Sequence, residues 1–462
     1  MVNKVLKSAE KLAQAAGVEL DIRSQLLDKK GVNEEVVRLI SAKNSEPEKI
    51  LDWRLDALAK WQKMNEPHWA FFGYQPLDYE NMRVFAEPVR DASADEKIRA
   101  AYEKLGVPLH EREILQGMAV DAVVDSRSVA TTYKKELAEK GIIFCSFGEA
   151  VKNHLPQVLK YLGSVVPPDD NFFAALNAAL FSDGTFVYVP KGIKCPIELS
   201  SYFRLQTEKL GQFERTLIIA DEGAELTYLE GCSAPMRSSH QLHAGVVELV
   251  ALKGARINYA TVQNWSDSVL NFVTKRGIVH DGAAIMWTQL EVGAAMTWKY
   301  PSCILKGDGA KGEFYSVAIT NNLQAADTGT RMVHLGRDTS SVIRAKSIAL
   351  GTSLSGFRSK VMIEPTAAGA KSSAKCDSLV LERARAMAEP VLEDKTSLAS
   401  VAHEASVSSI SEEQMFALAA LGLDEEAATS LIVNGFAHDV VRRLPAEFAL
   451  EARALINLKL EE

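Results

Sequence analysis

The chain has 462 residues, of which 47% are hydrophobic and 24% are charged, and its formal net charge at pH 7 is −8. This composition is typical of an ordinary globular protein, and the length suggests roughly three domains with a sizeable core. The isoelectric point of about 5.7 and the lack of any basic run argue against broad nucleic-acid binding.

The N-terminus has no continuous apolar run of the signal-peptide type, and no stretch approaches the about 18 apolar residues needed to span a bilayer. We therefore expect a cytoplasmic protein without a membrane partner. The five cysteines are far apart and form no Cys-x-x-Cys pair, which argues against a structural zinc site. Free thiols are typical of a reducing compartment.

Residues 1–140 are predicted to form a mostly helical domain. Asn33 can cap a helix over residues 34–43, and residues 48–64 have helical apolar spacing. A further short helix is expected over residues 95–106. Residues 141–183 mix strand and helix patterns, and strands dominate from residue 184 onward.

A repeat of 27–31 residues runs through the middle of the chain. It is marked by small residues after each turn: Ala224, Ala255, Ala283, Ala310, Ser340, Ala370 and Ser397. Most of them begin a short run of alternating polar and apolar residues, which is typical of a strand. A strand-rich repeat of this length predicts a solenoid, and here a parallel β-helix over residues 141–405 with coils about 4.8 Å apart.

The last segment, residues 406–462, is predicted to form a C-terminal helical domain. A helix should start at Ser411, with Glu413 in its first turn and an apolar stripe behind. Such a lobe could dock a partner or cap the end of the solenoid, and both roles could hold together.

The repeat also predicts a site near the end of the solenoid. Cys376 lies six residues after Ala370, and His403 lies six residues after Ser397. Side chains at equal positions of adjacent coils are neighbours, and Glu404 would lie beside them. A thiol, an imidazole and a carboxylate together can bind a metal. The spacing leaves open the alternative of a buried cysteine and a surface His-Glu pair.

Many sequence motifs between about residue 31 and the C-terminus occur in the same order as in one known family. They include ISAKNSEP, DSRSVATTY, GIIFCSFGEA, DNFFAALNAAL, YVPKGIKCP, EGCSAP, TVQNW, TWKYPSCIL, KCDSL, HEA and NGF. Together they resemble the SufB/SufD family of the SUF iron–sulfur assembly machine, and most closely its SufB members. The resemblance implies a mainly β fold, a right-handed parallel β-helix flanked by N-terminal and C-terminal helical segments.

The resemblance also implies a function and partners. The chain would be a scaffold for nascent iron–sulfur clusters and not an enzyme, with ATP hydrolysis supplied by the ATPase SufC docked on residues 406–462. Other implied partners are SufD or a second SufB copy and a cysteine desulfurase system as sulfur donor. Reduced flavin is associated with such complexes, although no nucleotide-binding motif is visible here. The alternative is a SufD-like structural subunit, and the KCDSL and HEA motifs together favour SufB.

Family roles transfer to matching positions of this sequence. Cys376, Glu404 and His403 match residues that hold the cluster, and Cys232 matches the cysteine that receives sulfur. The residues that match the sulfur-transfer path are Arg204, Gln263, Trp265 and Lys275. The run after Cys376, LERARAMAEP, lacks the Cys and His that relatives often carry there, so auxiliary ligands are in doubt.

The repeat adds a prediction about this path. Arg204 precedes Cys232 by 28 residues and Gln263 follows it by 31, about one coil each way. The spacing predicts one polar row along the solenoid, which would need partners if it faces inward. Arg204 and Lys375 could favour the thiolates of Cys232 and Cys376. The other cysteines, Cys145, Cys195 and Cys303, are expected to be structural, and so is His243.

A third function class is a β-helix enzyme that acts on polysaccharide. Such an enzyme needs paired carboxylates, and no such pair stands out at coil spacing.

Overall fold

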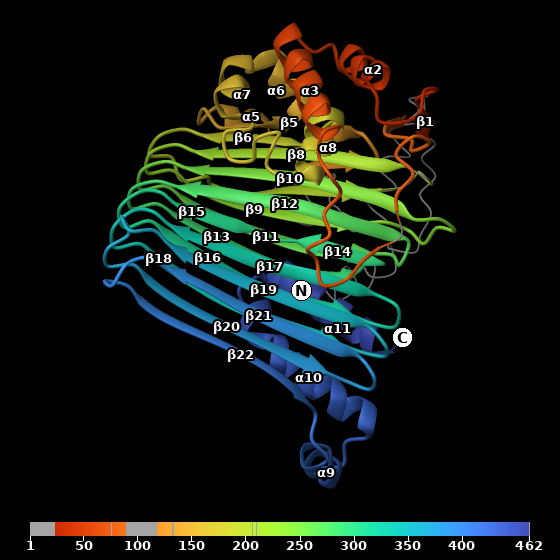
Figure 1. Cartoon of the computed structure of the whole chain (residues 1–462), viewed down its shortest axis with the longest axis vertical. Helices are drawn as coiled ribbons and strands as arrows, with labels where there is room; N and C mark the ends of the chain where they lie inside the picture. Colours follow the sequence, from red (N-terminus) through yellow and green to blue (C-terminus); the bar gives the residue numbers. More distant parts are fainter. Residues whose placement is uncertain are drawn as a thin grey trace.

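The computed structural model describes residues 24–74, 76–88, 118–131, 134–205, 207–208 and 210–461. Its centre is a parallel β-helix of about eight turns, flanked by helices at both ends (Figure 1). The predicted fold class is therefore confirmed. The strands form two 10-stranded sheets, and successive strands along the chain alternate between them over most of the solenoid.

Sheet I contains the strands that lie in front in Figure 1. They are β5 (Ile143–Ser146), β6 (Thr185–Val189), β8 (Gly211–Ala220), β10 (Gln241–Ala251), β12 (Val269–Val279), β14 (Met296–Lys299), β15 (Ser302–Leu305), β17 (Ala325–His334), β19 (Leu354–Ile363) and β21 (Arg385–Asp394). The short strands β14 and β15 share one place between β12 and β17. All pairings are parallel except that of β5 with β6.

Sheet II lies on the other side of the interior. Its strands are β4 (Arg127–Thr131), β3 (Met118–Val124), β7 (Glu198–Arg204), β9 (Glu225–Ser233), β11 (Arg256–Trp265), β13 (Ala284–Gly293), β16 (Lys311–Thr320), β18 (Ser340–Ala349), β20 (Lys371–Val380) and β22 (Ser400–Ser409). Strands β3 and β4 fall within the segment predicted to be mostly helical. Strand β3, with the largely apolar sequence MAVDAVV, extends the ladder beside β7.

The turn before each sheet II strand explains the repeat. In one turn Gly254 has a φ of 69°, which favours glycine, and the buried Ala255 follows it. The predicted alignment of Ala224, Ala255, Ala283 and Ala310 is confirmed by the ladder register.

The alignment is wrong by one or two residues at two later coils. Thr339, not Ser340, and Ala399, not Ser397, hold the equivalent positions, because Lys371 pairs with Ser340 and Ser400.

Stacked layers of like side chains fill the interior near these turns. Tyr228, Tyr259 and Trp287 form one such layer, with ring centroids 5.1 Å apart at both steps. All three rings are buried, and burying each stabilises the fold by about 1.5–3 kcal/mol. This apolar part of the interior fixes the register in which the polar side chains described below meet.

Helices cover the first coils and the outer face of sheet I. They are α2 (Glu34–Asn44), α3 (Glu48–Trp61), α5 (Lys134–Ala138), α6 (Phe147–Asn153), α7 (Leu155–Tyr161) and α8 (Phe172–Leu180). The predicted cap is confirmed, since Val36 donates its N–H to Asn33 Oδ1 at 3.0 Å. A short pair, β1 (Ser24–Leu26) with β2 (Ala86–Pro88), lies beside them. The helix expected over residues 95–106 falls outside the described residues.

The C-terminal helices are α9 (Glu412–Ala420), α10 (Glu425–Val441) and α11 (Ala446–Glu461). Helices α10 and α11 pack on the outer face of sheet II, whereas α9 projects beyond the last coil (Figure 1). Ser411 forms a capping box with Gln414 rather than with Glu413. Strand β22 continues to Ser409, four residues past the predicted end of the β-helix.

Candidate functional site

Cys232 lies near the end of β9 with its thiol directed into the solenoid. The side chain is only 4% exposed. Its thiol lies 3.8 Å from Glu230 Oε1, and Gln263 Nε2 on the next coil lies 3.5 Å from the sulfur. Residues two apart on a strand face the same side, so Glu230 and Cys232 share the interior.

The Glu230 carboxylate is the centre of this polar cluster. It accepts hydrogen bonds from Lys275 Nζ at 2.5 Å, from Gln263 Nε2 at 3.4 Å and from the Tyr259 hydroxyl. The side chains of Glu230 and Lys275 are both buried, with 1% exposure each. Buried charges are tolerated only when paired and hydrogen-bonded, and this pair meets that condition.

The network continues across the interior to sheet I. Gln263 Oε1 accepts from Trp265 Nε1 at 3.1 Å and from Asn271 Nδ2 at 2.9 Å. Asn271 Oδ1 lies 2.8 Å from His243 Nδ1, and His243 Nε2 lies 3.2 Å from a carboxylate oxygen of Glu214. A chain of polar side chains therefore leads from one sheet to the other.

A second buried ion pair lies one coil further along, between Lys299 and Glu291. Glu291 is the ladder partner of Gln263. The row that begins at Cys232 thus continues through Gln263 to Glu291, and only then becomes apolar at Ala318.

The surroundings set the proton affinities of these groups. Burial, together with the Glu230 and Glu214 carboxylates, holds the pKa of the Cys232 thiol well above its ordinary value, while Lys275 and Lys299 oppose this. Burial by itself would raise the pKa of Glu230, but the charges of Lys275 and Lys299 outweigh it and hold that pKa below its usual value. Burial lowers the pKa of Lys275, partly offset by Glu230.

The structure brings most of the predicted path together. Gln263, Trp265 and Lys275 all belong to the Cys232 network. The predicted row is wrong at Arg204: Phe203 is the ladder partner of Cys232, and Arg204 is paired with Ser233, whose hydroxyl it contacts at 3.0 Å. The coil between these strands has 29 residues, not 28, so Arg204 falls on the opposite face.

Sequence reasoning missed several members of the network. They are Glu230, Glu214, His243, Asn271, Lys299 and Glu291. Two of them could have been predicted from their spacing in the sequence. Glu230 has the strand parity of Cys232, and Glu291 follows Gln263 by one coil. His243 was expected to be structural, but it contacts both Asn271 and Glu214.

The second thiol, Cys376, faces the interior from β20, one coil before the end of sheet II. It lies 3.6 Å from the Ser359 hydroxyl of sheet I, and the same hydroxyl lies 2.5 Å from His403 Nε2. Ser359 thus bridges the two predicted ligands across the interior. Burial raises the pKa of the Cys376 thiol to about 11, partly offset by the Ser359 hydrogen bond, and burial lowers the pKa of His403.

The predicted geometry of this site needs two corrections. His403 is the ladder partner of Ala374, and Cys376 is paired with Ala405, so the two are offset by two residues on the same face. Glu404 lies on the outer face, where its carboxylate is 3.8 Å from Lys375 Nζ. Lys375 therefore does not lie against the thiol. Within the described ranges, no group of three His, Cys, Asp or Glu side chains is arranged to hold a metal.

One column of interior side chains runs from Glu230, two residues before Cys232, to Cys376. The ladder register aligns Glu230, Thr261, Gln289, Ser316, Ala345 and Cys376 on successive coils. Five coil steps correspond to about 24 Å. Three of the four intervening side chains are polar and the fourth is the small Ala345, and Gln289 donates to Ser316 Oγ at 3.3 Å.

The solenoid ends in open strand edges. Within the described part of the chain nothing pairs with the free side of β22 or of β21 (Figure 1). Most side chains of β22 are exposed, including Val407 at 53%. A groove of about 660 Å³ opens beside these strands, lined by Phe71, Phe72, Leu354, Val380, Ala384–Met387 and Val407–Ser409.

The remaining cysteines lie apart from both thiols. Cys145 and Cys303 are buried, and Cys195 is half-buried. Burial raises the pKa of Cys303 to about 12. Along the described ranges, the chain has no helix that is both long and apolar enough to cross a bilayer.

Comparison with known proteins gives two family matches. Residues 203–436 match the SufBD core domain of the SUF system of iron–sulfur cluster assembly, and residues 115–199 match the N-terminal region of SufBD proteins.

Full-length relatives agree. An iron–sulfur cluster assembly SufBD family protein of Synechocystis is 51% identical over 448 residues, covering 94% of this chain and 93% of the relative. One from Porphyra purpurea is 48% identical, covering 94% and 92%. The Arabidopsis thaliana protein ABCI8, described as chloroplastic, is 46% identical, covering 94% and 80%.

Proposed function

Because the chain belongs to the SufBD family of iron–sulfur cluster assembly proteins, we propose that it is a SufB-type scaffold that receives sulfur at Cys232 and holds the nascent cluster near Cys376. It would work as a scaffold and not as an enzyme. The observation that carries the proposal is the placement of the two thiols. They lie in one closed interior, about five coils apart, in two chemically different surroundings.

The surroundings of Cys232 suit sulfur acceptance. A donor persulfide would transfer its outer sulfur to the Cys232 thiolate, so that one S–S bond breaks, one S–S bond forms and the donor leaves as a thiolate. Only the thiolate attacks. Burial and the Glu230 carboxylate hold the thiol protonated in the closed chain, so we propose that the proton leaves when the site opens to the donor, with Lys275 stabilising the thiolate.

Access to Cys232 requires a local opening. The thiol is closed off by an apolar group that includes Phe203, Leu205, Trp265 and Ala294. A donor, which we propose to be a cysteine desulfurase system, would therefore reach Cys232 only when the loops at this rim move apart.

The surroundings of Cys376 suit weak ligation. Stable clusters are usually held by four thiolates, whereas Cys376 and His403 supply one sulfur and one nitrogen. Metal binding must displace the thiol proton. Glu404 would join this set only after β22 rearranges, since its carboxylate lies on the outer face. Weak ligation fits a scaffold whose product must leave.

A second subunit would complete the site. The free edge of β22 presents unpaired backbone groups next to His403, and such an edge is a template for another strand. We propose that a SufD subunit or a second copy of this chain pairs there.

The C-terminal lobe would dock an ATPase of the SufC type. Helix α9 buries none of its residues, and Phe416 and Leu421 are 78% and 79% exposed. Isolated apolar side chains on a projecting helix are suited to helix-in-groove docking. Reduced flavin would act at the level of this complex, and the complex would work in the cytoplasm.

A SufD-like structural subunit is the second candidate. It is favoured by the absence, in the described ranges, of a three-ligand group around Cys376.

Co-expression with the ATPase, with and without a SufD subunit, distinguishes the two. After reconstitution with iron and sulfide, a visible cluster absorption that is lost in Cys376→Ala but kept in Cys195→Ser supports the scaffold. Retention of the cluster in Cys376→Ala, or no cluster in any combination, favours the structural role. Glu404→Ala tests the rearrangement: loss of the cluster places Glu404 among the ligands.

A further inference from the structure

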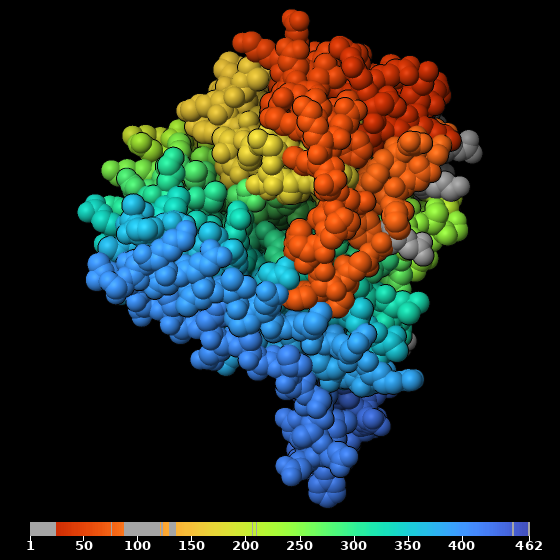
Figure 2. All heavy atoms as spheres, viewed as in Figure 1, coloured from red at the N-terminus to blue at the C-terminus, as the bar shows by residue number. Residues whose placement is uncertain are grey.

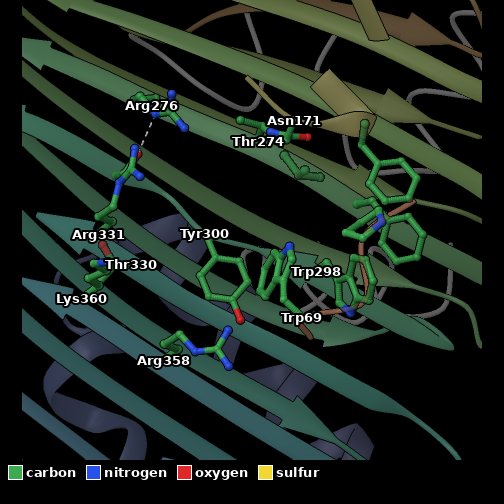
Figure 3. Close-up of a pocket in the computed structure, with 15 residues that line it drawn as sticks. Trp69, Asn171, Thr274, Arg276, Trp298, Tyr300, Thr330, Arg331, Arg358 and Lys360 are labelled. Atoms are coloured by element: carbon green, nitrogen blue, oxygen red, sulfur yellow. Dashed lines mark hydrogen bonds between the residues drawn. The ribbon is translucent and has the colours of Figure 1, made fainter. Parts of the chain in front are cut away.

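A pocket on the outer face of sheet I is separate from both thiols. It encloses about 420 Å³ between the sheet, the start of α8 and the segment around Trp69, and appears as a recess in Figure 2. Its lining includes Trp69, Trp298, Tyr300, Arg276, Arg331 and Lys360 (Figure 3). This volume lies within the range of about 300–1,000 Å³ that is usual for small-molecule sites.

One wall of the pocket is a row of cations. The ladder register aligns Arg276 with Ser302, Ser302 with Arg331, and Arg331 with Lys360. The three positive side chains therefore emerge from one column on the outer face. Arg358 from β19 adds a fourth.

Three of these four cations already have carboxylate partners. Arg276 is paired with Asp170, Arg358 with Glu389 at 3.0 Å, and Lys360 with Glu393 at 2.7 Å.

Arg331 forms no ion pair with any described residue, although it is partly buried. Burial and the neighbouring Arg276 lower its pKa. A guanidinium held between two other cations is the group that an incoming anion would pair with first.

The opposite wall is aromatic. Trp298 and Phe272 are ladder partners on the outer face of sheet I. Trp69 stacks on Trp298, with ring centroids 5.9 Å apart and an interplanar angle of 28°. It also makes an edge-to-face contact with Tyr300, with ring centroids 5.3 Å apart. Trp69 remains 55% exposed, with the Arg358 guanidinium 5.4 Å from its ring centre, so a planar ring can stack on the exposed surface beside this cation.

We propose that this pocket binds a phosphorylated ligand that carries a planar ring, of the nucleotide type. The phosphate pairs with Arg331, flanked by Arg276 and Lys360, and the ring stacks against Trp69. The fork of an arginine matches phosphate geometry. A cationic wall facing an aromatic wall distinguishes such a ligand from a simple anion. Lys275 and Arg276 lie on opposite faces of β12, so this strand separates the pocket from the network around Cys232.

The test uses the full-length chain without its partners, so that no ATPase contributes. The probes are ATP, NADP and FMN, with adenosine, riboflavin and inorganic phosphate as counterparts. Tryptophan fluorescence reports binding, because Trp69 and Trp298 line the pocket, and calorimetry gives the affinity. We expect saturable binding of at least one phosphorylated probe and clearly weaker binding of its counterpart lacking either phosphate or ring.

Variants locate the site. Arg331→Met should lower the affinity for the probe that binds by a factor on the order of ten, as expected for loss of a charge-assisted hydrogen bond. Trp69→Ala should weaken binding and reduce the fluorescence change. The control Arg337→Met removes an exposed arginine that pairs with Asp308 away from the pocket. Unchanged thermal melting shows that each variant folds.

Three results would overturn the proposal. They are no saturable binding of any phosphorylated probe at millimolar concentration, equal affinity for probe and unphosphorylated counterpart, and equal effects of Arg331→Met and Arg337→Met.

Discussion

Cys232 and Cys376 are both interior thiols of sheet II, but they lie in contrasting parts of the solenoid. Cys232 is enclosed by coils on both sides and lies among buried charges, with Glu230 and Lys275 in contact. Cys376 lies one coil from the open end, near one half-buried histidine and one hydroxyl. The difference follows from position in the stack, because several coils follow the Cys232 coil, whereas only β22 follows β20 in sheet II.

This contrast separates two chemical tasks. Sulfur acceptance needs a thiolate, which Lys275 and Lys299 favour against burial and the nearby carboxylates. Release of a cluster needs ligands that are incomplete and accessible. The same ladder provides both conditions, the first on an inner coil and the second next to its open end.

The buried pair should give the largest effect on stability. Glu230→Leu leaves Lys275 buried without a carboxylate partner, which should cost about 3–5 kcal/mol of unfolding free energy. Denaturant titration measures it. Glu230→Gln keeps the shape and some hydrogen bonding, so it should cost less. A loss below 1 kcal/mol in Glu230→Leu would show that Lys275 is not charged in the folded protein.

The dependence of the unfolding free energy on pH below neutrality tests the same buried ion pair. The pKa of Glu230 is lowered by folding, so its contribution is present above the ordinary value of 4.5 and is lost as the pH falls below it. The stability gap between wild type and Glu230→Gln should therefore shrink below pH 4.5. A gap that widens on acidification contradicts the assignment.

A proline in the free edge strand should disrupt the pairing of a second subunit at the open end of the solenoid. Ser406→Pro in β22 removes a backbone N–H and restricts the edge strand. We expect association with a second family subunit to weaken by about tenfold or more, equivalent to about 1.4 kcal/mol. Light scattering measures this. Ser266→Pro, at a loop far from the edge, is the control, and equal effects would place the interface elsewhere.

Thiol reactivity should distinguish the two regions next. The pKa of Cys376 is raised to about 11, so its alkylation by iodoacetamide should rise as the pH approaches 11 and be slow at neutral pH. Peptide mass spectrometry follows each cysteine separately. Cys232, which is enclosed, should stay protected until the chain unfolds. Fast labelling of Cys232 at neutral pH would mean that its rim is open.

The smallest effect is expected at the surface pair beside Cys376. Glu404→Gln breaks a 3.8 Å contact between two well-exposed groups, which should change the unfolding free energy by less than about 1 kcal/mol. A larger loss would show that Glu404 has an interior role in the isolated chain.

The sequence was sufficient to predict the solenoid because buried small residues recur after each turn. Ala224, Ala255, Ala283 and Ala310 hold equivalent places in the ladder. The strands at residues 118–131 were not predicted, because the place of β3 beside β7 depends on a partner 80 residues away in sequence, and β4 in turn pairs with β3.

The candidate sites were predicted less well than the fold. A coil that is one residue longer than assumed moved Arg204 to the opposite face, and one misaligned serine displaced His403 by two positions. Lys299 could not be placed from spacing, since its contact with Glu291 crosses from sheet I to sheet II. Glu214 contacts a histidine on the neighbouring coil of sheet I that is two residues out of register with it.

The central claim is that sulfur arrives at Cys232 and that Cys376 holds the product. The most direct measurement is to expose the assembled complex to the cysteine desulfurase and cysteine, without iron, and map persulfide by mass spectrometry in wild type, Cys232→Ser and Cys376→Ser. The account predicts persulfide on Cys232 in wild type and in Cys376→Ser, and none on the Cys232→Ser chain. Persulfide that forms first on Cys376, and that persists in Cys232→Ser, would contradict it.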